Sequence, residues 1–335
     1  MTEKINRICP PAVDAGLRLD EILASHTTFA VGGPADIWLS PRRRPSPAGG
    51  EELAVNILTP AQDDPLELFL SRLVPLLREE GVPLTLLGGG ANVVVSDRGI
   101  RGVVLDTAGL DRLVYGTFKA DSPLCDRLYL GAGVPVDRAV DDSIRCGLAG
   151  LEFLAGMPGT LGGAVWMNAR CYGSSIADIL VETRYLDEDG SIRVLPFAPG
   201  DFDYKKSPFQ GTPRFILGAV LRLEAGDSTT LAATAAAHRA DRREKGHYTL
   251  PCAGSAFKND RRFGKPSGQI IDEAGLRGLS IGDAQLAPWH GNIIVNRGKA
   301  TATDIRALAE EVRRRVLALT GFDLECEILF LGDWS

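Results

Sequence analysis

Three short polar segments carry the side chains best suited to chemistry. Tyr204, Lys205 and Lys206 stand in FDYKKSPFQ, Ser255 stands in LPCAGSAFKND, and Glu327 stands in the closing stretch FDLECEILFL. A hydroxyl, an ammonium group and a carboxyl group are suited to moving a proton and to stabilising developing negative charge. Each segment alone also has a structural explanation: solvated loop lysines, a serine in a turn or cap, and a solvent-facing carboxylate on an edge strand.

Glycine is in excess, with 38 of 335 residues, and it gathers in two places. Gly88–Gly90 form one cluster, and the stretch from Gly147 to Gly173 holds seven more. Glycine lets backbone amides approach a ligand closely, and consecutive amides can hold a pyrophosphate. Tight turns are the alternative explanation for either cluster alone. The Rossmann and P-loop fingerprints are absent, because Val93 and Ile293 stand where those patterns need a glycine.

Composition narrows the class of protein. The chain has 43 acidic and 37 basic residues, a formal net charge of −6, whereas a dedicated nucleic-acid binder is usually basic. Its six cysteines lack metal-ligand spacing, which indicates reduced thiols, a cytoplasmic protein and no metal site. The N-terminus lacks the apolar core of a secretory signal, and no apolar run approaches the ~20 residues that span a bilayer. We therefore expect no nucleic-acid partner and no membrane insertion.

Five cationic or titratable residues precede the serine segment and can contact phosphates. They are Arg239, Arg242, Arg243, Lys245 and His247. Because Asp241 and Glu244 dilute this charge, a helix face of mixed charge is the alternative. His290, before an apolar strand, is either a structural histidine or a ligand contact.

Hydrophobic spacing predicts the helices that position these side chains. They are expected over 66–80, with a kink or break at Pro75, and over 136–146, 175–181 and 228–243. A final helix is expected from a cap at Thr303 to Gly321. Its apolar stripe consists of Ile305, Leu308, Val312, Val316 and Leu319.

β-branched and apolar runs predict the strands. They are expected at 83–87, 92–95, 103–105, 128–130, 191–195 and 215–223, and as two short strands around a glycine turn within 26–41. The closing stretch is expected to be a strand with Asp323, Glu325 and Glu327 on one face. The order of elements indicates an α+β protein with mixed sheets rather than a regular βαβ series.

Six motifs follow one another along the chain. They are HTTFAVGGPAD, LLGGGANVVVSDRGIRGVVL, GLAGLEFLAGMPGTLGGAVWMNARCYG, FDYKKSPF, CAGSAFKND and the Glu327 strand. In order and spacing they resemble the UDP-N-acetylenolpyruvoylglucosamine reductases, from about His26 to Gly332. GGGAN alone is a weak signal, whereas six ordered motifs are a strong one. The pattern Y-x-x-S-x-F resembles the shorter, second type of this family.

The resemblance implies an α+β chain with an FAD-binding fold of the vanillyl-alcohol-oxidase (PCMH) type in two subdomains and a C-terminal α+β substrate-binding domain. The expected bounds are 1–85, 86–226 and 227–327, with a final strand at 328–335 that returns to the first subdomain. The resemblance also implies FAD as cofactor and NADPH as co-substrate. The expected reaction converts UDP-N-acetylglucosamine enolpyruvate to UDP-N-acetylmuramate in peptidoglycan precursor synthesis, and we expect a monomer.

Residues that match the family motifs receive roles from the resemblance. The expected FAD contacts are Val31, Gly32, Gly88, Gly89, Gly90 and Asn92 near the pyrophosphate, and Gly156, Thr160, Gly162 and Gly163 along the flavin. The expected catalytic residues are Lys205 and Glu327, which stabilise charge in the substrate carboxylate, and Ser255, which protonates the adjacent carbon. The expected substrate contacts are Tyr204, Lys258 and Asn259.

Two departures from the family pattern keep alternatives open. Lys205 stands where the family has an arginine, so the charge is kept but the planar bidentate fork is lost. Arg170 and Cys171 stand where the family has glycine and alanine. A nucleotide-sugar sensor without catalysis would explain both departures. An FAD oxidase of another small alcohol or hydroxy acid would share the fold but would have no need of Ser255 and Glu327.

Overall fold

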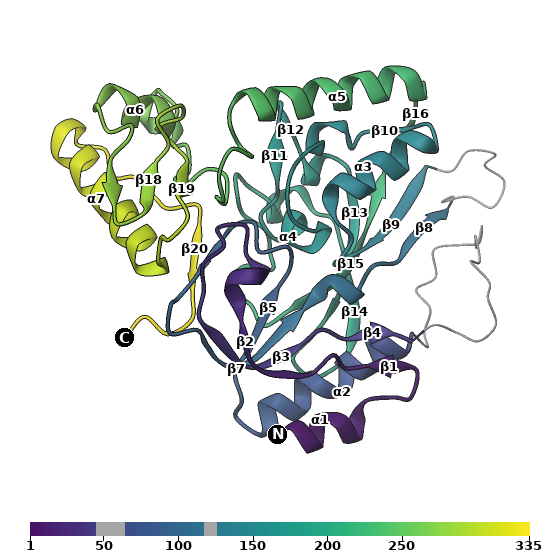
Figure 1. Cartoon of the computed structure of the whole chain (residues 1–335). Coiled ribbons are helices and arrows are strands. Elements are labelled where there is room, and N and C mark those ends of the chain that lie inside the picture. The colour runs from purple at the N-terminus through teal and green to yellow at the C-terminus, as the bar shows by residue number, and fades with distance from the viewer. Residues whose placement is uncertain (45–63, 117–125) are drawn as a thin grey trace. The chain divides into compact units, whose positions relative to one another are not determined.

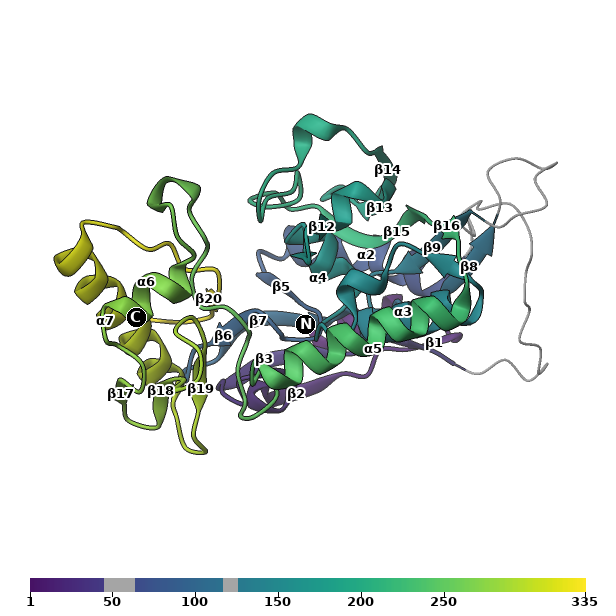
Figure 2. The same cartoon turned by 90° about the horizontal axis from the view of Figure 1, so that it is seen from above.

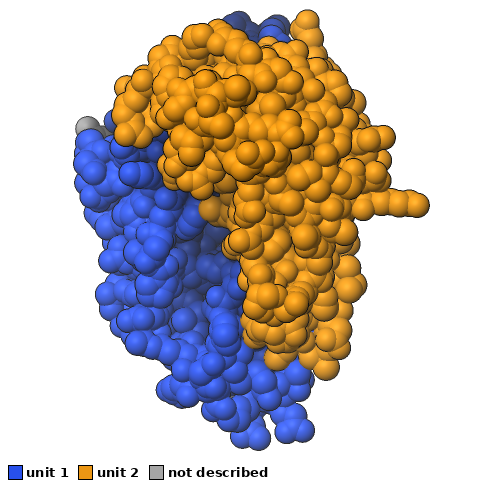
Figure 3. Space-filling model, turned by 90° about the vertical axis from the view of Figure 1, so that its left-hand side faces the viewer, with its two compact units in different colours: residues 1–18, 38–89, 103–239 blue, residues 19–37, 90–102, 240–335 orange. Residues whose placement is uncertain are grey.

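The computed structural model describes residues 1–44, 64–116 and 126–335. The described chain forms two compact units, each made of three stretches of sequence. Unit 1 consists of Met1–Arg18, Trp38–Gly89 and Val103–Arg239, and unit 2 consists of Leu19–Ile37, Gly90–Gly102 and Ala240–Ser335 (Figure 3). A compact unit need not coincide with a functional domain, so the division into three domains remains a prediction.

Unit 1 is built on an antiparallel five-stranded sheet (Figure 1). The strand order is β14-β13-β15-β9-β8. The strands are β8 (Leu113–Gly116), β9 (Arg127–Gly131), β13 (Leu180–Leu186), β14 (Ile192–Pro196) and β15 (Phe215–Arg222). The first seven residues of β15 are buried, which accounts for its almost unbroken apolar sequence. Helix α4 (Leu161–Trp166) packs against this strand.

A second sheet has the order β2-β3-β7-β5. Its strands are β2 (Arg18–Ile22), β3 (Pro34–Leu39), β5 (Leu84–Leu87) and β7 (Ile100–Asp106). β5 pairs in parallel with residues 103–106 of β7, and this pair lies in unit 1, while the first residues of β3 and β7 belong to unit 2. Within 26–41 only β3 is a strand, and η1 (Leu23–His26) is a short 3-10 helix, so the predicted pair of strands there was wrong.

Helix α2 (Pro65–Glu79) precedes β5. The Asp64 side chain caps it by accepting a hydrogen bond from Leu66 N at 2.9 Å, and Pro65 occupies the first helical position. The helix is not divided at Pro75. Burial of its apolar face, which includes Phe69 and Leu73, offsets the ~3 kcal/mol that an internal proline costs.

The remaining elements of unit 1 are short strand pairs and helices. The pairs are β1 (Val13–Asp14) with β4 (Arg42–Arg43), β10 (Leu148–Ala149) with β16 (Glu224–Ala225), and β11 (Arg170–Cys171) with β12 (Ser174–Ser175). The helices are α1 (Thr2–Ile8), α3 (Val136–Arg145) and α5 (Ser228–Glu244), the last of which runs on into unit 2. α3 and α5 lie side by side in both views (Figures 1 and 2).

Two of the predicted helices are confirmed in α3 and α5, and the one over 175–181 was wrong. That segment has a single 3-10 turn, η4 (Ile176–Asp178), after which β13 begins. The chain is extended there because β13 pairs with both β14 and β15.

Unit 2 packs helix α7 (Ala302–Thr320) against a small antiparallel sheet and against α6 (Ser267–Glu273) (Figure 1). The sheet consists of β17 (Ser280–Ile281), β18 (Ala284–Leu286) and β19 (Ile294–Asn296). The predicted stripe of α7 is buried from Ile305 to Val316, but Leu319 is 66% exposed. The cap of α7 is Thr301, not Thr303, because Thr301 and Asp304 form a reciprocal capping box.

The closing strand is shorter than predicted. β20 (Leu329–Leu331) pairs in parallel with β6 (Val93–Val95), and the preceding residues 322–328 form only an isolated bridge through Cys326. Both strands lie in unit 2. Among the residues described, no helix is long and apolar enough to cross a membrane.

Candidate active site

Two glycine-rich backbone segments of unit 1 lie close enough to exclude side chains. A Cβ on Gly89 would lie 2.7 Å from the Cα of Gly159, and a Cβ on Gly88 would lie 2.6 Å from Oγ1 of Thr160. The Thr160 hydroxyl is buried and has no hydrogen-bond partner among the described residues. Buried hydroxyls are normally paired, so this one is suited to a bound ligand. We call the facing segments 88–89 and 159–160 the glycine cradle. The cradle and the unpaired Thr160 hydroxyl fit the predicted FAD contacts.

A third segment, 131–136, is paired with the second of these. Val136 N donates to Gly159 O at 3.1 Å, and Leu161 N donates to Val134 O at 2.9 Å. A Cβ on Gly162 would lie 2.9 Å from the Cβ of Ala132. Gly131-x-Gly133 does not match a Rossmann fingerprint, because Val136 stands where that pattern needs its third glycine. Its position directly after a strand was the signal that could have identified it as part of the cradle.

The turn that carries Lys205 is attached to the end of α4. Gln210 Nε2 donates to the carbonyl oxygens of Lys205, at 2.9 Å, and Trp166, at 2.8 Å. Ser207 Oγ also donates to Trp166 O, at 2.8 Å. Lys205 is half-buried and Lys206 exposed, so a solvated loop charge describes Lys206 better than Lys205. Tyr204 is half-buried beside them.

Ser255 lies in unit 2 on a segment held between two others. Ser255 forms an antiparallel bridge with Ile293, and Ala256 N donates to Asn292 O at 2.8 Å. The buried Asn292 side chain then closes a pair of hydrogen bonds with the Phe257 backbone, each 2.8 Å. The Ser255 hydroxyl has no hydrogen-bond partner among the residues described. A serine so held is available to donate a proton.

Glu327 lies on the segment that pairs with the other side of the serine segment. Glu327 N donates to Ala256 O at 2.8 Å, and Phe257 bridges Cys326. This register places Glu327 opposite Ala256, one residue from Ser255. Glu327 is only 8% exposed, so the explanation as a solvent-facing carboxylate was wrong. Its shared face with Asp323 and Glu325 was also wrong, because those two residues are exposed and the strand is irregular there.

Two predicted substrate contacts take part in internal contacts of unit 2. Lys258 Nζ lies 2.6 Å from Oε1 of Glu325. Asn259 Oδ1 accepts a hydrogen bond from Ser267 N at 2.9 Å, at the start of α6. Lys258 keeps a half-buried, charged head, but both side chains also stabilise the local fold.

Four predicted pyrophosphate contacts, Val31, Gly32, Gly90 and Asn92, also lie in unit 2. A Cβ on Gly90 would lie 2.1 Å from His26 O, and one on Gly32 would lie 2.9 Å from the Cβ of Val95. The Val31 side chain is buried in the hydrophobic core, so a contact from this residue must come from its backbone. Asn92 Nδ2 donates to the carbonyl oxygen of Glu327 at 3.1 Å.

The cationic stretch before Ser255 is largely engaged in internal contacts. Arg239 pairs with Asp137 and Asp141, Lys245 pairs with Asp241 at 2.8 Å, and Arg242 is buried. A helix face of mixed charge therefore describes these residues.

Two histidines of unit 2 lie close together, with the ring centroids of His247 and His290 6.0 Å apart and the rings tilted by 52°. Burial, followed by the charge of Arg242, lowers the pKa of His247 to about 4. Burial also lowers the pKa of His290, and His290 Nδ1 accepts a hydrogen bond from Asn292 N at 3.1 Å. His290 is therefore at least in part structural.

Arg170 is exposed on the β11–β12 hairpin.

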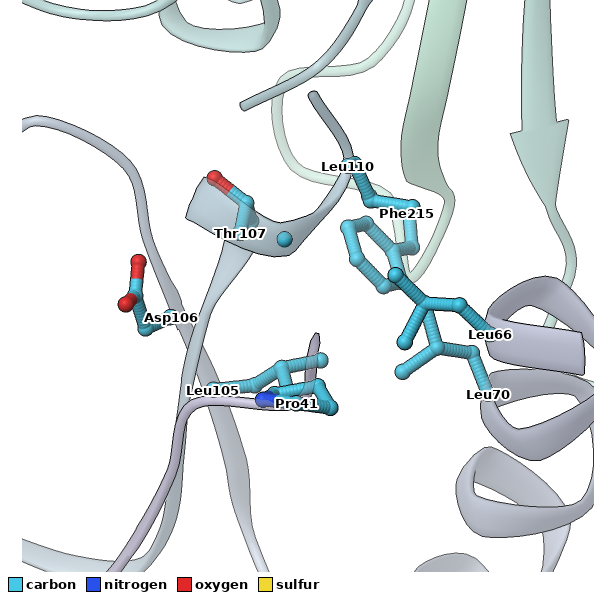
Figure 4. A pocket seen from close by; sticks show the side chains of 9 residues that line it. Pro41, Leu66, Leu70, Leu105, Asp106, Thr107, Leu110 and Phe215 are labelled. Atoms are coloured by element: carbon cyan, nitrogen blue, oxygen red, sulfur yellow. The ribbon is translucent and has the colours of Figure 1, made fainter. Parts of the chain in front are cut away.

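Unit 1 also has a small apolar hollow between α2, β7 and β15 (Figure 4). Its lining residues are Pro41, Leu66, Leu70, Leu105, Asp106, Thr107, Gly109, Leu110 and Phe215. None of them belongs to the predicted site.

Comparison with known proteins defines the class of protein first. A family model described as "FAD binding domain" matches residues 69–195, which include Gly88–Gly90 and the Gly156–Gly163 segment. A model described as "UDP-N-acetylenolpyruvoylglucosamine reductase, C-terminal domain" matches residues 246–331, which include Ser255 and Glu327. The chain is therefore an oxidoreductase with FAD as its cofactor, and the predicted fold of the vanillyl-alcohol-oxidase type is confirmed.

Relatives over the whole chain then define the family. The UDP-N-acetylenolpyruvoylglucosamine reductase of Treponema denticola is 38% identical over 322 residues, which cover 92% of this chain and 91% of the relative. The enzyme of the same name from Borreliella burgdorferi is 37% identical, with 92% and 93% covered. The crystal structure of UDP-N-acetylenolpyruvylglucosamine reductase from Thermus caldophilus aligns with a TM-score of 0.70 and 30% identity, covering 94% of this chain and all of that one. The chain belongs to the UDP-N-acetylenolpyruvoylglucosamine reductase family.

Proposed function

We propose that this chain reduces UDP-N-acetylglucosamine enolpyruvate to UDP-N-acetylmuramate, with NADPH as the reductant, in peptidoglycan precursor synthesis. The observation that carries the proposal is the retention of Ser255 and Glu327 on adjacent, hydrogen-bonded backbone segments in a chain that matches reductases over 92% of its length. A non-catalytic relative would have no need to keep a serine and a buried carboxyl group in this register.

Each of the three catalytic residues is proposed to act on one part of the substrate. FAD, when bound, supplies the carrier that accepts a hydride from NADPH and passes it on to the enol ether. As the carbon–carbon π bond breaks, its electrons move toward the neighbouring carboxylate. Lys205 and Glu327 stabilise that charge, the first as a cation and the second through a hydrogen bond. Ser255 gives its proton to the adjacent carbon, so that two C–H bonds replace the π bond.

The proposed cofactor contacts follow from the cradle. The amides of Gly88–Gly90 and the residues Val31, Gly32 and Asn92 hold the pyrophosphate, while Gly156, Thr160, Gly162 and Gly163 line the flavin. The free Thr160 hydroxyl and the lack of room for side chains at Gly88 and Gly89 support this assignment. Tyr204, Lys258 and Asn259 are proposed to contact the substrate.

The test measures NADPH oxidation by the FAD-loaded protein with and without the enolpyruvyl nucleotide. S255A should lower substrate-dependent turnover by about 10²- to 10⁴-fold, the usual contribution of a general acid, while flavin reduction by NADPH stays near the native rate. S280A, which changes an exposed serine of unit 2, is the matched control.

Other outcomes would point to the alternatives. Rapid oxidation of reduced flavin by oxygen, without any need for the enolpyruvyl nucleotide, would indicate an oxidase. An inert native protein whose turnover appears on K205R would indicate a binding protein that has lost catalysis.

A further inference from the structure

One carboxylate oxygen in unit 1 joins helix α3, helix α5 and the glycine-rich loop. Asp137 stands in the first turn of α3, and its Oδ1 accepts a hydrogen bond from Gly156 N at 2.7 Å. The same oxygen accepts from Arg239 on α5, from Nε at 3.0 Å and Nη2 at 2.7 Å. Arg239 Nη2 also donates to Asp141 at 2.6 Å. The bond to Gly156 is thus a charge-assisted one whose acceptor is fixed by a guanidinium group.

The residue beside Arg239 holds the other end of the same loop. His238 Nδ1 lies 2.8 Å from Glu152 O. Because a carbonyl oxygen can only accept, Nδ1 carries the hydrogen and donates it. The His238 ring stacks on Tyr172 with centroids 3.8 Å apart and planes 7° from parallel, which fixes the imidazole. Two consecutive residues of α5 therefore hold the 152–156 segment: His238 contacts Glu152 directly, and Arg239 holds Gly156 through Asp137.

The loop geometry at Gly156 depends on this support. Gly156 has φ of 73°, in the left-handed region, and Gly159 follows with φ of 110°. Backbone in such conformations has many alternatives in a glycine-rich segment, so its amide directions have to be set by external partners. Asp137 supplies that partner for the Gly156 amide.

We propose that Asp137, oriented by Arg239, is a positioning residue that sets the backbone of Gly156 for flavin binding. This inference rests on the proposed assignment of Gly156 to the flavin. Asp137 itself acts only through Gly156. Asp141 shares the same arginine but accepts from no backbone amide among the described residues, so it makes a matched control.

The experiment titrates FAD into apo-protein for D137A, D137N and D141A, and records the visible circular dichroism of the bound flavin. D137A removes a charge-assisted hydrogen bond, so the FAD dissociation constant should rise about 10- to 150-fold and the flavin spectrum should change. D137N keeps an acceptor oxygen but loses the negative charge that Arg239 orients, so it should weaken FAD binding less than D137A does and should still change the flavin spectrum measurably. D141A should stay within about twofold of the native protein.

Equal effects of D137A and D141A would overturn the proposal, because the shared loss would then be only the ion pair with Arg239. A native flavin spectrum in both D137A and D137N would also overturn it. If D137A does not fold, D137N and D141A decide: a spectrum that changes in D137N alone supports the proposal, and identical spectra oppose it. FAD binding needs no enolpyruvyl nucleotide, so failure of the proposed reaction would appear separately, as absent turnover in the native protein.

Discussion

Replacing Gly163 by alanine should change the thermal stability of the apo-protein and its affinity for FAD in opposite directions. Gly163 is the third residue of α4, and a Cβ there would meet only Thr160 Oγ1, at 3.9 Å. Alanine in place of glycine within a helix stabilises by about 0.5–1 kcal/mol. For a unit of this size, that free energy raises the melting temperature by about 1–4 °C. The apo-protein carrying G163A should therefore be more stable than the native apo-protein.

FAD binding should move in the opposite direction. If Gly163 lines the flavin, the added methyl group overpacks the site at a cost of about 1–3 kcal/mol, which weakens FAD binding about 5- to 150-fold. Thermal unfolding of apo-protein and FAD titration measure the two effects independently. G200A is the control, because a Cβ on Gly200 meets nothing within 4 Å. Native FAD affinity in G163A would refute the flavin contact, and a lower melting temperature would refute the estimate of free space.

Three further predictions concern charged or titratable side chains. E327Q should lower substrate-dependent turnover by at least about 10²-fold, whereas D323N, at an exposed position of the same stretch, should change it less than twofold; similar effects of both would remove Glu327 from its role. E67Q should destabilise unit 1 by about 3 kcal/mol in urea unfolding, since it leaves the Arg184 guanidinium, whose side chain is only 12% exposed and lies 2.7 Å from the native carboxylate, without its charge partner. The folded pKa of His247, about 4, is below the ordinary value of ~6.5, so the stability that it contributes is present above pH ~6.5 and is lost as the pH falls toward 4. H247N should therefore flatten the pH dependence of unfolding in that window, and an unchanged slope would contradict the assignment.

Elements with strong local signals were predictable from the sequence. α5 was expected from its alanine-rich run, and α7 was expected from its apolar stripe and its final glycine, Gly321, which has the left-handed conformation with φ of 75°. These signals act within one helix, so they need no knowledge of the rest of the fold. β15 was likewise evident, because a strand buried along its length needs an apolar sequence.

The errors lie where distant segments decide the structure. The start of β13 was predicted as a helix, although it extends because strands on both sides pair with it. The alternation in the closing stretch suggested an exposed Glu327. Instead, its carbonyl oxygen accepts a hydrogen bond from Asn92 and its amide donates one to Ala256, which hold this residue in an irregular, buried segment. Asp137 was missed altogether, since only the fold brings it to Gly156. Pattern within a segment carries no information about such partners.

Lys205 gives a physical reason to connect an unusual backbone with function. Its φ is 58°, in the left-handed region, where a side chain costs about 1–2 kcal/mol and a glycine would cost little. The hydrogen bonds from Gln210 to the carbonyl oxygens of Lys205 and Trp166 hold the turn in this conformation. This local strain is compatible with the proposed role of the Lys205 side chain, although other non-glycine residues, such as Ala30 and Tyr172, also have a positive φ. In the proposed reaction, Lys205 keeps the positive charge of the family's arginine without its planar fork.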